Sequence, residues 1–378
     1  MATSSGPPDP PVDPVPGRPD PGVPVLVLHV PRTGGSTLKF LLREAYGSDR
    51  TLLDVHRYPD DPWPTADYAV VEGHVAAPFY GRRFGAGWVA NGVTILREPV
   101  ARVVSQARHI RARPGPLQAT LAAPVRDPAD LFARVPRLAD LQTKLLAGAP
   151  IEVPADEDTL ARAVATLDLL AFGLTEALDA TIALLSERFG FGAAPFGVSN
   201  AAAPTGDTDL RSEAFRTAAA AHNRFDRRLF DHARESFAAR CEHLTATLLG
   251  LPLADAAASG ALRYLRREAT DAVRRPKAGV RGRLSGWILV DGRAPDAVVV
   301  RAGDSVVPAV PRLHRDEGAR LTGRASDRRA GFAATLALPA DATTVEVIAF
   351  DRARGRRASL TVPVTDAPRR RFGPGSRS

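Results

Sequence analysis

The chain has 378 residues, 44% of them hydrophobic, which is enough for about two domains with buried cores. Its single cysteine excludes an internal disulfide and fits a reducing compartment. The formal net charge of +8 is uneven, because residues 263–378 hold 24 Lys or Arg against 12 Asp or Glu and the remainder sums to −4. This basic part lacks the aromatic interleaving and zinc spacing of nucleic-acid binders. We therefore expect no nucleic-acid partner, but a surface suited to an anionic glycan or to a membrane surface.

The N-terminal stretch is rich in proline: the first 24 residues hold nine of them and no apolar run long enough for a signal peptide or a membrane span. We therefore predict a disordered, extended leader over residues 1–22. The folded part is predicted to begin with the apolar run at residue 23.

The stretch HVPRTGGST, His29 to Thr37, follows the apolar run Val23–Leu28 and leads into the apolar segment Leu38–Leu42. This order predicts a strand, a glycine-bearing turn and a helix, whose N-terminal N–H groups and dipole favour an anion. Gly34 and Gly35 would let the backbone approach a phosphate closely. The nucleotide-triphosphate motif G-x-x-x-x-G-K-[ST] is absent, and a turn that binds no ligand stays open as an interpretation of this stretch alone.

A second predicted strand, Tyr68–Val71, leads into GHVAAPFYG, Gly73 to Gly81. His74 stands at the end of this strand, and its imidazole is of the type that exchanges protons near neutral pH. Strand alternation puts Glu72 on the side opposite to its neighbours. A histidine that only closes the strand by a hydrogen bond is the alternative interpretation.

A third strand-to-helix transition is predicted in VTILREPVARVVSQARH, residues 93–109. Pro99 suits the first turn of a helix, where its missing N–H is not needed. Arg97 at the strand end and Ser105 two turns into the helix would point into one crevice above the carboxyl edge of a parallel sheet. A guanidinium fork beside a hydroxyl suits a terminal phosphate monoester, whereas an arginine that only caps the helix is the plainer alternative.

Together these stretches resemble the sulfotransferases that use 3′-phosphoadenosine 5′-phosphosulfate (PAPS), in particular the branch with the heparan sulfate 2-O- and 6-O-sulfotransferases and their bacterial relatives. HVPRTGGSTL is similar to the family's 5′-phosphosulfate loop, and LREPVARVVSQARH is similar to its 3′-phosphate motif L-R-x-P-x-x-R-x-x-S. Three further stretches follow in the family's order, so that the likeness covers residues 23–250: LADLQTKLLAG (138–148), FGLTEALDATIALLSERFGF (172–191) and HNRFDRRLFDHARESF (222–237).

The resemblance implies a P-loop-like, doubly wound α/β fold over residues 23–253. It also implies transfer of a sulfuryl group from PAPS, without a metal, to a hydroxyl of a carbohydrate or glycolipid. His74 is then the general base, with Glu72 as the alternative, and Arg32 is the cation at the leaving group. The donor-binding residues that the resemblance implies are Arg32, Thr33, Gly34, Gly35, Ser36, Thr37, Arg97 and Ser105. An Ala- and Arg-rich composition is typical of a GC-rich bacterium, and a cytoplasmic location is expected because PAPS is made in the cytoplasm.

Three positions depart from the family's pattern. Arg32 replaces the usual lysine of the loop, which keeps a fork for sulfate oxygens but removes a practical proton donor. Asp140 replaces an asparagine and leaves its contact open. Phe230 replaces a tyrosine, which indicates a change in packing.

The C-terminal part has a different pattern. Residues 254–280 are Ala-rich and then basic, and predict a helix and a linker. Short alternating stretches separated by Gly, Asp and Pro predict an accessory β-sandwich over residues 281–365, folding as an independent module outside the crevice. Residues 366–378 are predicted to be a disordered basic tail.

Two other functions remain open at this point. A nucleotide-dependent kinase would use a similar sheet and anion site, but it needs Mg²⁺ and a lysine-bearing loop. A noncatalytic glycan-binding protein would keep the fold without the chemistry. Binding of adenosine 3′,5′-bisphosphate together with turnover distinguishes the three.

Overall fold

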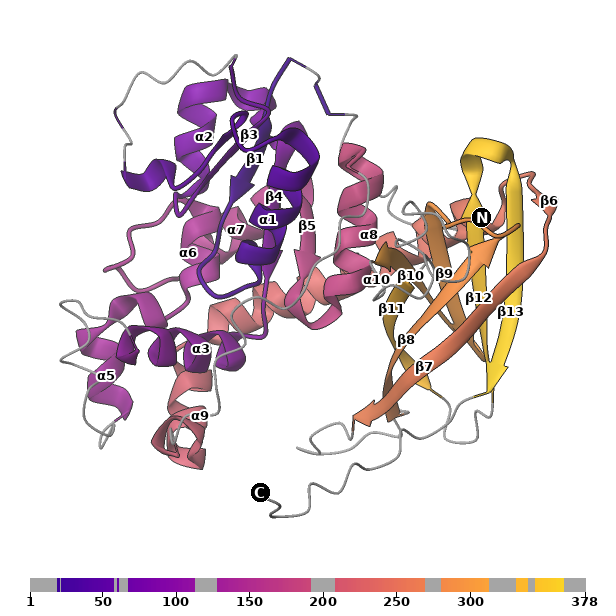
Figure 1. Ribbon diagram of the computed structural model, residues 1–378. Coiled ribbons are helices and arrows are strands. Elements are labelled where there is room, and N and C mark those ends of the chain that lie inside the picture. The colour runs from indigo at the N-terminus through magenta and orange to yellow at the C-terminus, as the bar shows by residue number, and fades with distance from the viewer. Residues whose placement is uncertain are drawn as a thin grey trace, which may run out of the picture.

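A computed structural model gives the fold as two parts that follow each other along the chain (Figure 1). The first is a five-stranded parallel sheet with helices, and the second is built from eight strands. This confirms the prediction of an α/β core followed by an all-β C-terminal part. The structure describes residues 19–20, 22–57, 60, 67–112, 128–191, 208–268, 280–312, 331–338 and 344–363.

The parallel sheet has the strand order β2-β3-β1-β4-β5. From β1 the chain first crosses to one edge and later returns past β1 to the other, so the winding direction reverses between β1 and β4. In open α/β sheets ligands bind at the carboxyl ends of the strands at such a reversal. The strands are β1 (Val25–Leu28), β2 (Thr51–Leu52), β3 (Val70–Gly73), β4 (Gly92–Leu96) and β5 (Ala171–Leu174).

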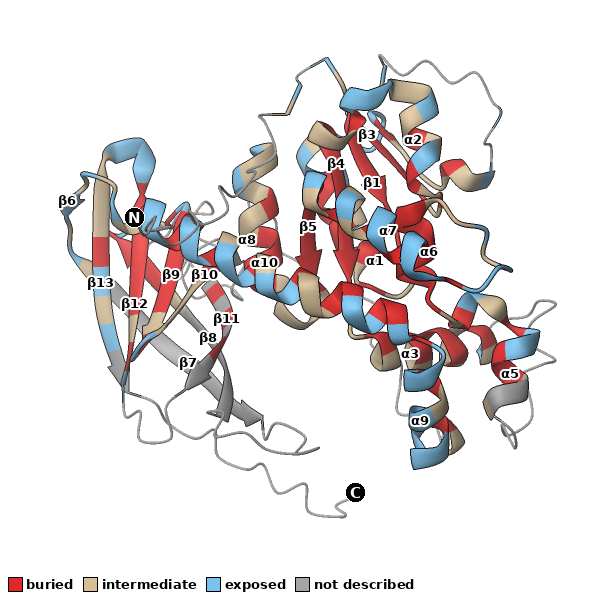
Figure 2. Cartoon of the chain, turned by 180° about the vertical axis from the view of Figure 1, so that it is seen from behind, coloured by how far each residue is buried: buried red, intermediate tan, exposed pale blue. Residues whose placement is uncertain are grey.

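Helices cover both faces of this sheet, because successive strand residues point to opposite sides and both sides are apolar. Val25 and Val27 pack on the side of α1 (Gly35–Tyr46) and α8 (Leu178–Phe189). Leu26 and Leu28 pack on the other side, and Figure 2 shows the strands buried between the helix layers. The helices on that other side are α2 (Ala77–Phe84), α6 (Leu141–Ala147), α7 (Glu157–Leu169) and α10 (Arg224–Leu249).

A smaller apolar cluster joins three further helices beside the core. Val103 and Ala107 of the first of them pack on Phe132 and Phe215 of the other two. These helices are α3 (Pro99–Arg111), α5 (Pro128–Arg134) and α9 (Glu213–Ala221); short 3-10 turns lie at Val55–Arg57, Ala86–Asn91, Pro136–Leu138, Thr175–Ala177, Asp209–Arg211 and Arg352–Arg354. In the part of the chain that the structure describes, no helix has the length and apolarity needed to cross a membrane.

The second part is a curled sheet with the order β6-β13-β12-β9-β10-β11-β8-β7. β10 pairs with β9 through Ser305–Ala309 and with β11 through Val310–Arg312. It therefore connects the two halves of the curved sheet, which encloses an apolar core. The strands are β6 (Ala254–Asp255), β7 (Ala258–Glu268), β8 (Val280–Val290), β9 (Ala297–Ala302), β10 (Ser305–Arg312), β11 (Gly331–Leu338), β12 (Thr344–Asp351) and β13 (Arg356–Pro363).

Two of the predicted boundaries are wrong. The helix predicted within residues 254–280 is replaced by β6 and β7, because β7 pairs along its length with β8 and long-range pairing overrides the helical preference of an Ala-rich run. The leader predicted to be disordered to residue 22 is held at its end: the backbone N–H of Asp20 donates to Oδ1 of Asn91 at 2.8 Å. Residues 1–18, 269–279 and 364–378 lie outside the described residues.

The two parts share a buried joint, of which the sequence showed no sign. Arg352 of the second part donates to Glu187 of α8 at 2.8 Å and to Asp296 at 3.0 Å. We call the following buried residues, from α10 and from the second sheet, the interdomain cluster: Leu244, Leu248, Ala297, Val299, Ile348 and Phe350.

Candidate active site

The turn after β1 carries the first predicted motif and leads directly into α1. Arg32 and Gly34 both have positive φ, at 69° and 93°. Glycine adopts a positive φ readily, so this conformation is favourable at Gly34 but not at Arg32. Thr33 is buried, and its hydroxyl donates to the carbonyl oxygen of Val30 at 2.8 Å. No side chain caps α1, so its first turn presents backbone N–H groups and the positive end of the helix dipole toward this edge of the sheet.

Two details of this turn were not predicted. A Cβ at residue 35 would overlap the His29 ring, so the packing of His29 by itself requires glycine at this position. The N–H of Thr37 donates to the carbonyl oxygen of Gly34 at 2.9 Å, which removes it from the set of available donors. Ser36 is exposed at the start of α1, and its hydroxyl remains the accessible one in this turn.

The loop after β4 meets the loop after β1 through Arg32. The Nε of Arg32 donates to Oγ of Ser105 at 3.1 Å, and its terminal nitrogen lies 3.2 Å from Nδ1 of His109. Arg97 in turn donates to the carbonyl oxygen of Arg32 at 3.0 Å. The three predicted anion-binding side chains Arg32, Arg97 and Ser105 are therefore brought together, on α3 and the two loops that precede α1 and α3.

The backbone of Arg97 is fixed by two hydrogen bonds with the side chain of Gln142 in α6. The side-chain amide of Gln142 accepts from the N–H of Arg97 at 2.9 Å and donates to its carbonyl oxygen at 2.9 Å. Burial lowers the pKa of Arg97, although the carboxylates of Glu176 and Glu98 oppose this shift. A guanidinium in such a half-buried position interacts with an anion more strongly than one in open water.

His74 lies at the end of β3, beside β1. Its Nδ1 donates to the carbonyl oxygen of His29 at 2.8 Å, and its backbone N–H donates to Nδ1 of His56 at 3.2 Å. Burial and the neighbouring His29 lower the pKa of His74 to about 4. Because a carbonyl oxygen only accepts, Nδ1 carries the proton of the neutral ring, and the lone pair of His74 is on Nε2.

Glu72 is buried and engaged by three donors, which argues against it as the base. Its carboxylate bonds to Nδ1 of His29, lies 3.1 Å from Nζ of Lys39 and accepts from the N–H of Asp54 at 3.1 Å. Burial alone would raise the pKa of Glu72, but the hydrogen bond to His29 and the charges of His29 and Lys39 lower it to about 2. Glu72 therefore fixes His29, whose carbonyl oxygen fixes His74.

Three histidines and two carboxylates gather near the end of β3. Within the described ranges, however, no three of the His, Cys, Asp and Glu side chains are arranged to hold a metal ion. The rings of His29 and His56 have centroids 4.3 Å and 4.9 Å from that of His74. The three rings and the Glu72 carboxylate are linked by hydrogen bonds instead.

Asp140, whose contact the sequence left open, has a structural position. Its Oδ1 accepts from the N–H of Phe225 at 3.0 Å and of Asp226 at 2.9 Å, at the start of α10. Burial, and then the charge of Asp226, raise the pKa of Asp140 to about 6. The fully buried Arg102 lies 3.8 Å from Asp226. These groups join α3, α6 and α10 behind the loop that bears Arg97.

Sequence reasoning gave no role to three residues that build this site: Lys39, Gln142 and Thr175. Thr175 donates to the carbonyl oxygens of Thr33 at 2.6 Å and Leu96 at 3.1 Å, and so ties the ends of β1 and β4 together. Gln142 and Thr175 stand inside the recognised stretches 138–148 and 172–191, which was a usable signal. Lys39 gave none, since its partners Asp54 and Glu72 are distant in the sequence.

Comparison with known proteins adds no family assignment. No protein-family model matches the chain. A search of curated proteins finds no significant match either.

Proposed function

We propose that the chain is a sulfotransferase that moves a sulfuryl group from PAPS to a hydroxyl of a carbohydrate or glycolipid, with His74 as the general base. One observation carries this proposal. An uncapped helix N-terminus, the Arg32–Arg97–Ser105 group and an imidazole with its lone pair on Nε2 follow β1, β4 and β3, three adjacent strands, at one sheet edge. That edge lies where the winding of the sheet reverses.

The donor has two anionic ends, and this edge offers two matching sets of groups. The start of α1 with Ser36 and the N–H groups of Gly35 and Ser36 suits the 5′-phosphosulfate. Arg97 and Ser105 suit the 3′-phosphate. When bound, PAPS supplies a sulfuryl group with adenosine 3′,5′-bisphosphate as leaving group.

Arg32 has a double role in this proposal. In the free protein its guanidinium bonds to Ser105 and contacts His109. To stabilise charge at the leaving group it exchanges these partners for oxygens of the donor, a change of side-chain rotamer within one loop. A guanidinium that meets developing negative charge contributes roughly 3 kcal/mol to the transition state.

His74 takes the proton of the acceptor hydroxyl at Nε2. The hydrogen bond from Nδ1 of His74 to the carbonyl oxygen of His29 keeps the proton of the neutral ring on Nδ1. Nε2 therefore presents its lone pair to the acceptor hydroxyl. With a pKa of about 4 the ring is neutral at working pH and ready to accept. Charged phosphate and sulfate groups of a bound donor would raise that pKa and make the ring a stronger base in the complex.

The acceptor class and the location are part of the same proposal. The basic residues 263–378 suit an anionic glycan or lipid surface, and the described residues of the second part contact α8 and α10. The cytoplasm, where PAPS is made, is the proposed place of the reaction.

Transfer of radiolabel tests the proposal. The purified full chain is incubated with ³⁵S-labelled PAPS and a polysaccharide and lipid extract, and label in chromatographically separated fractions is counted. We expect label in a carbohydrate-containing fraction with wild type and with His243→Ala, an exposed histidine of α10. With His74→Ala the rate should fall about a hundredfold or more. Tight binding of the bisphosphate without any transfer would overturn the enzyme and favour a noncatalytic glycan-binding protein.

A further inference from the structure

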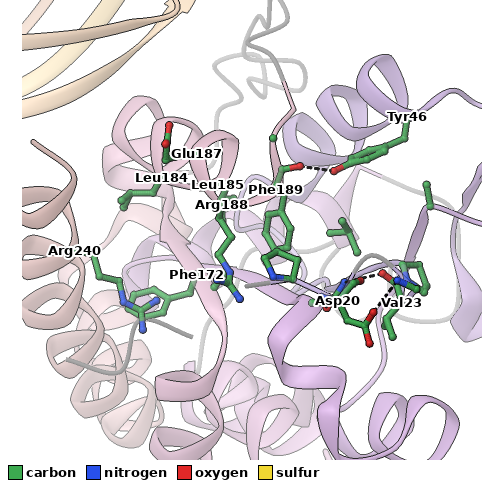
Figure 3. A pocket seen from close by; sticks show the side chains of 18 of the residues that line it. Asp20, Val23, Tyr46, Phe172, Leu184, Leu185, Glu187, Arg188, Phe189 and Arg240 are labelled. Atoms are coloured by element: carbon green, nitrogen blue, oxygen red, sulfur yellow. Dashed lines mark hydrogen bonds between the residues drawn. The ribbon is translucent and has the colours of Figure 1, made fainter. Parts of the chain in front are cut away.

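A cavity of about 920 Å³ lies at the amino ends of the parallel strands, the edge opposite to the candidate active site (Figure 3). Val25 at the start of β1, Ala171 at the start of β5, and the residues just before β3 and β4 line it. Its volume falls within the range of small-molecule sites. Phe172 and Arg188 of the stretch 172–191 line it, and the proposed function gives neither of them a role.

The walls of this cavity are mostly apolar. They come from the segment before β1, from β5, and from α8 and α10: Val23, Phe172, Leu184, Leu185, Phe189 and Leu244. The Tyr46 hydroxyl donates to the carbonyl oxygen of Phe189 at 2.8 Å, which ties α1 to the end of α8. An apolar chain would therefore replace water over much of the cavity surface.

One wall carries two arginines. Arg188 of α8 and Arg240 of α10 both reach toward Phe172 in Figure 3, and the guanidinium of Arg240 stacks on that ring at 4.3 Å. Hydrogen bonds to carbonyl oxygens fix both: Arg188 to Ala90 at 2.6 Å and Arg240 to Leu170 at 3.0 Å. Burial, and then the charge of Arg240, lower the pKa of Arg188. Two fixed like charges on one wall favour an anion.

Two carboxylates also line the cavity. Glu187 pairs with Arg352 at 2.8 Å, and Asp20 accepts from the N–H of Gly22 at 2.8 Å. Arg50 is a third lining cation. The lining therefore combines apolar side chains with three arginines and two carboxylates.

We infer that this cavity binds a single-chain amphiphilic anion, an acyl chain that ends in a carboxylate, with the carboxylate at Arg188 and Arg240. The chain lies along the apolar walls of α8 and α10. Leu184 and Leu244 also pack in or against the interdomain cluster, so the ligand touches the helices that hold the second part. The inference stands independently of the sulfotransferase proposal.

Calorimetric titration of the full chain with laurate tests the inference, with dodecanol as the neutral chain and butyrate as the short anion. Wild type should bind laurate at least tenfold more tightly than either. Arg188→Gln and Arg240→Gln should each weaken laurate binding about tenfold, whereas Arg162→Gln, on the exposed surface of α7, should not. Circular dichroism melting checks that each variant is folded.

Several results would overturn the inference: no heat of binding, equal affinity for laurate and dodecanol, or unchanged affinity in both folded arginine variants. The comparison of laurate with dodecanol uses wild type alone, so it decides the matter even where a variant does not fold.

Discussion

Glu72 offers a quantitative test of the network that orients His74. The side chain is 1% exposed, so solvent screening does not discount its interactions. Its pKa falls from 4.5 to about 2. At about 1.36 kcal/mol per unit, the lowered pKa corresponds to ~3 kcal/mol of stability at neutral pH.

The sign of the pH dependence follows from the lowered pKa. The contribution is complete above the unfolded value of 4.5 and is lost as pH falls toward the folded value of about 2. By pH 3, about 2 kcal/mol of it should be gone. Glu72→Gln removes the titration, so we expect this variant to be less stable by ~3 kcal/mol at pH 7 and to lose about 2 kcal/mol less than wild type between pH 7 and pH 3.

Urea unfolding followed by circular dichroism at pH 7, 5, 4 and 3 measures both differences. Asp158→Asn is the matched control, because Asp158 is 76% exposed and pairs with Arg162 across one turn of α7. It should change the stability by less than about 1 kcal/mol at every pH. Equal pH dependence in Glu72→Gln and wild type would refute the role of this carboxylate in holding His29.

Three further predictions concern the base, its neighbour and the interdomain joint. In wild type the acid limb of kcat/KM for PAPS, which reports the enzyme without bound donor, should fall near the pKa of about 4 of His74 rather than near 6.5, and a limb at 6.5 would mean another base. His56→Asn, whose amide oxygen can replace Nδ1 as acceptor for the His74 N–H, should retain most of the turnover that His56→Ala loses; equal losses would show that the ring itself is needed. A chain ending at residue 253 should aggregate or melt at lower temperature, because Leu244 and Leu248 become exposed, and a soluble truncation with an unchanged melting temperature would contradict the interdomain cluster.

The local elements of the core were predictable because each carries its own signal. The apolar run Val25–Leu28 before a glycine-bearing turn, and Pro99 after a β-branched run, fix the β1–α1 and β4–α3 transitions. Two such transitions on parallel strands must meet at the same edge, which is why Arg32, Arg97 and Ser105 could be expected together.

Contacts between distant segments could not be predicted in the same way. The reason for Gly35 is the ring of His29, which reaches it only because Glu72 holds that ring from β3. The strand character of Ala258–Glu268 depends on pairing with β8, and a local Ala-rich pattern cannot report a partner beyond residue 279. The joint between the two parts likewise depends on β12 meeting α10.

The most direct test of the central claim is equilibrium binding of adenosine 3′,5′-bisphosphate against adenosine 5′-phosphate. Wild type and His74→Ala should both bind the bisphosphate at least tenfold more tightly, since the 3′-phosphate gains a charge-assisted bond from Arg97. Arg97→Ala should erase that preference, and Arg162→Ala should keep it. Equal affinity of wild type for the two nucleotides, or no binding of either, would contradict the account.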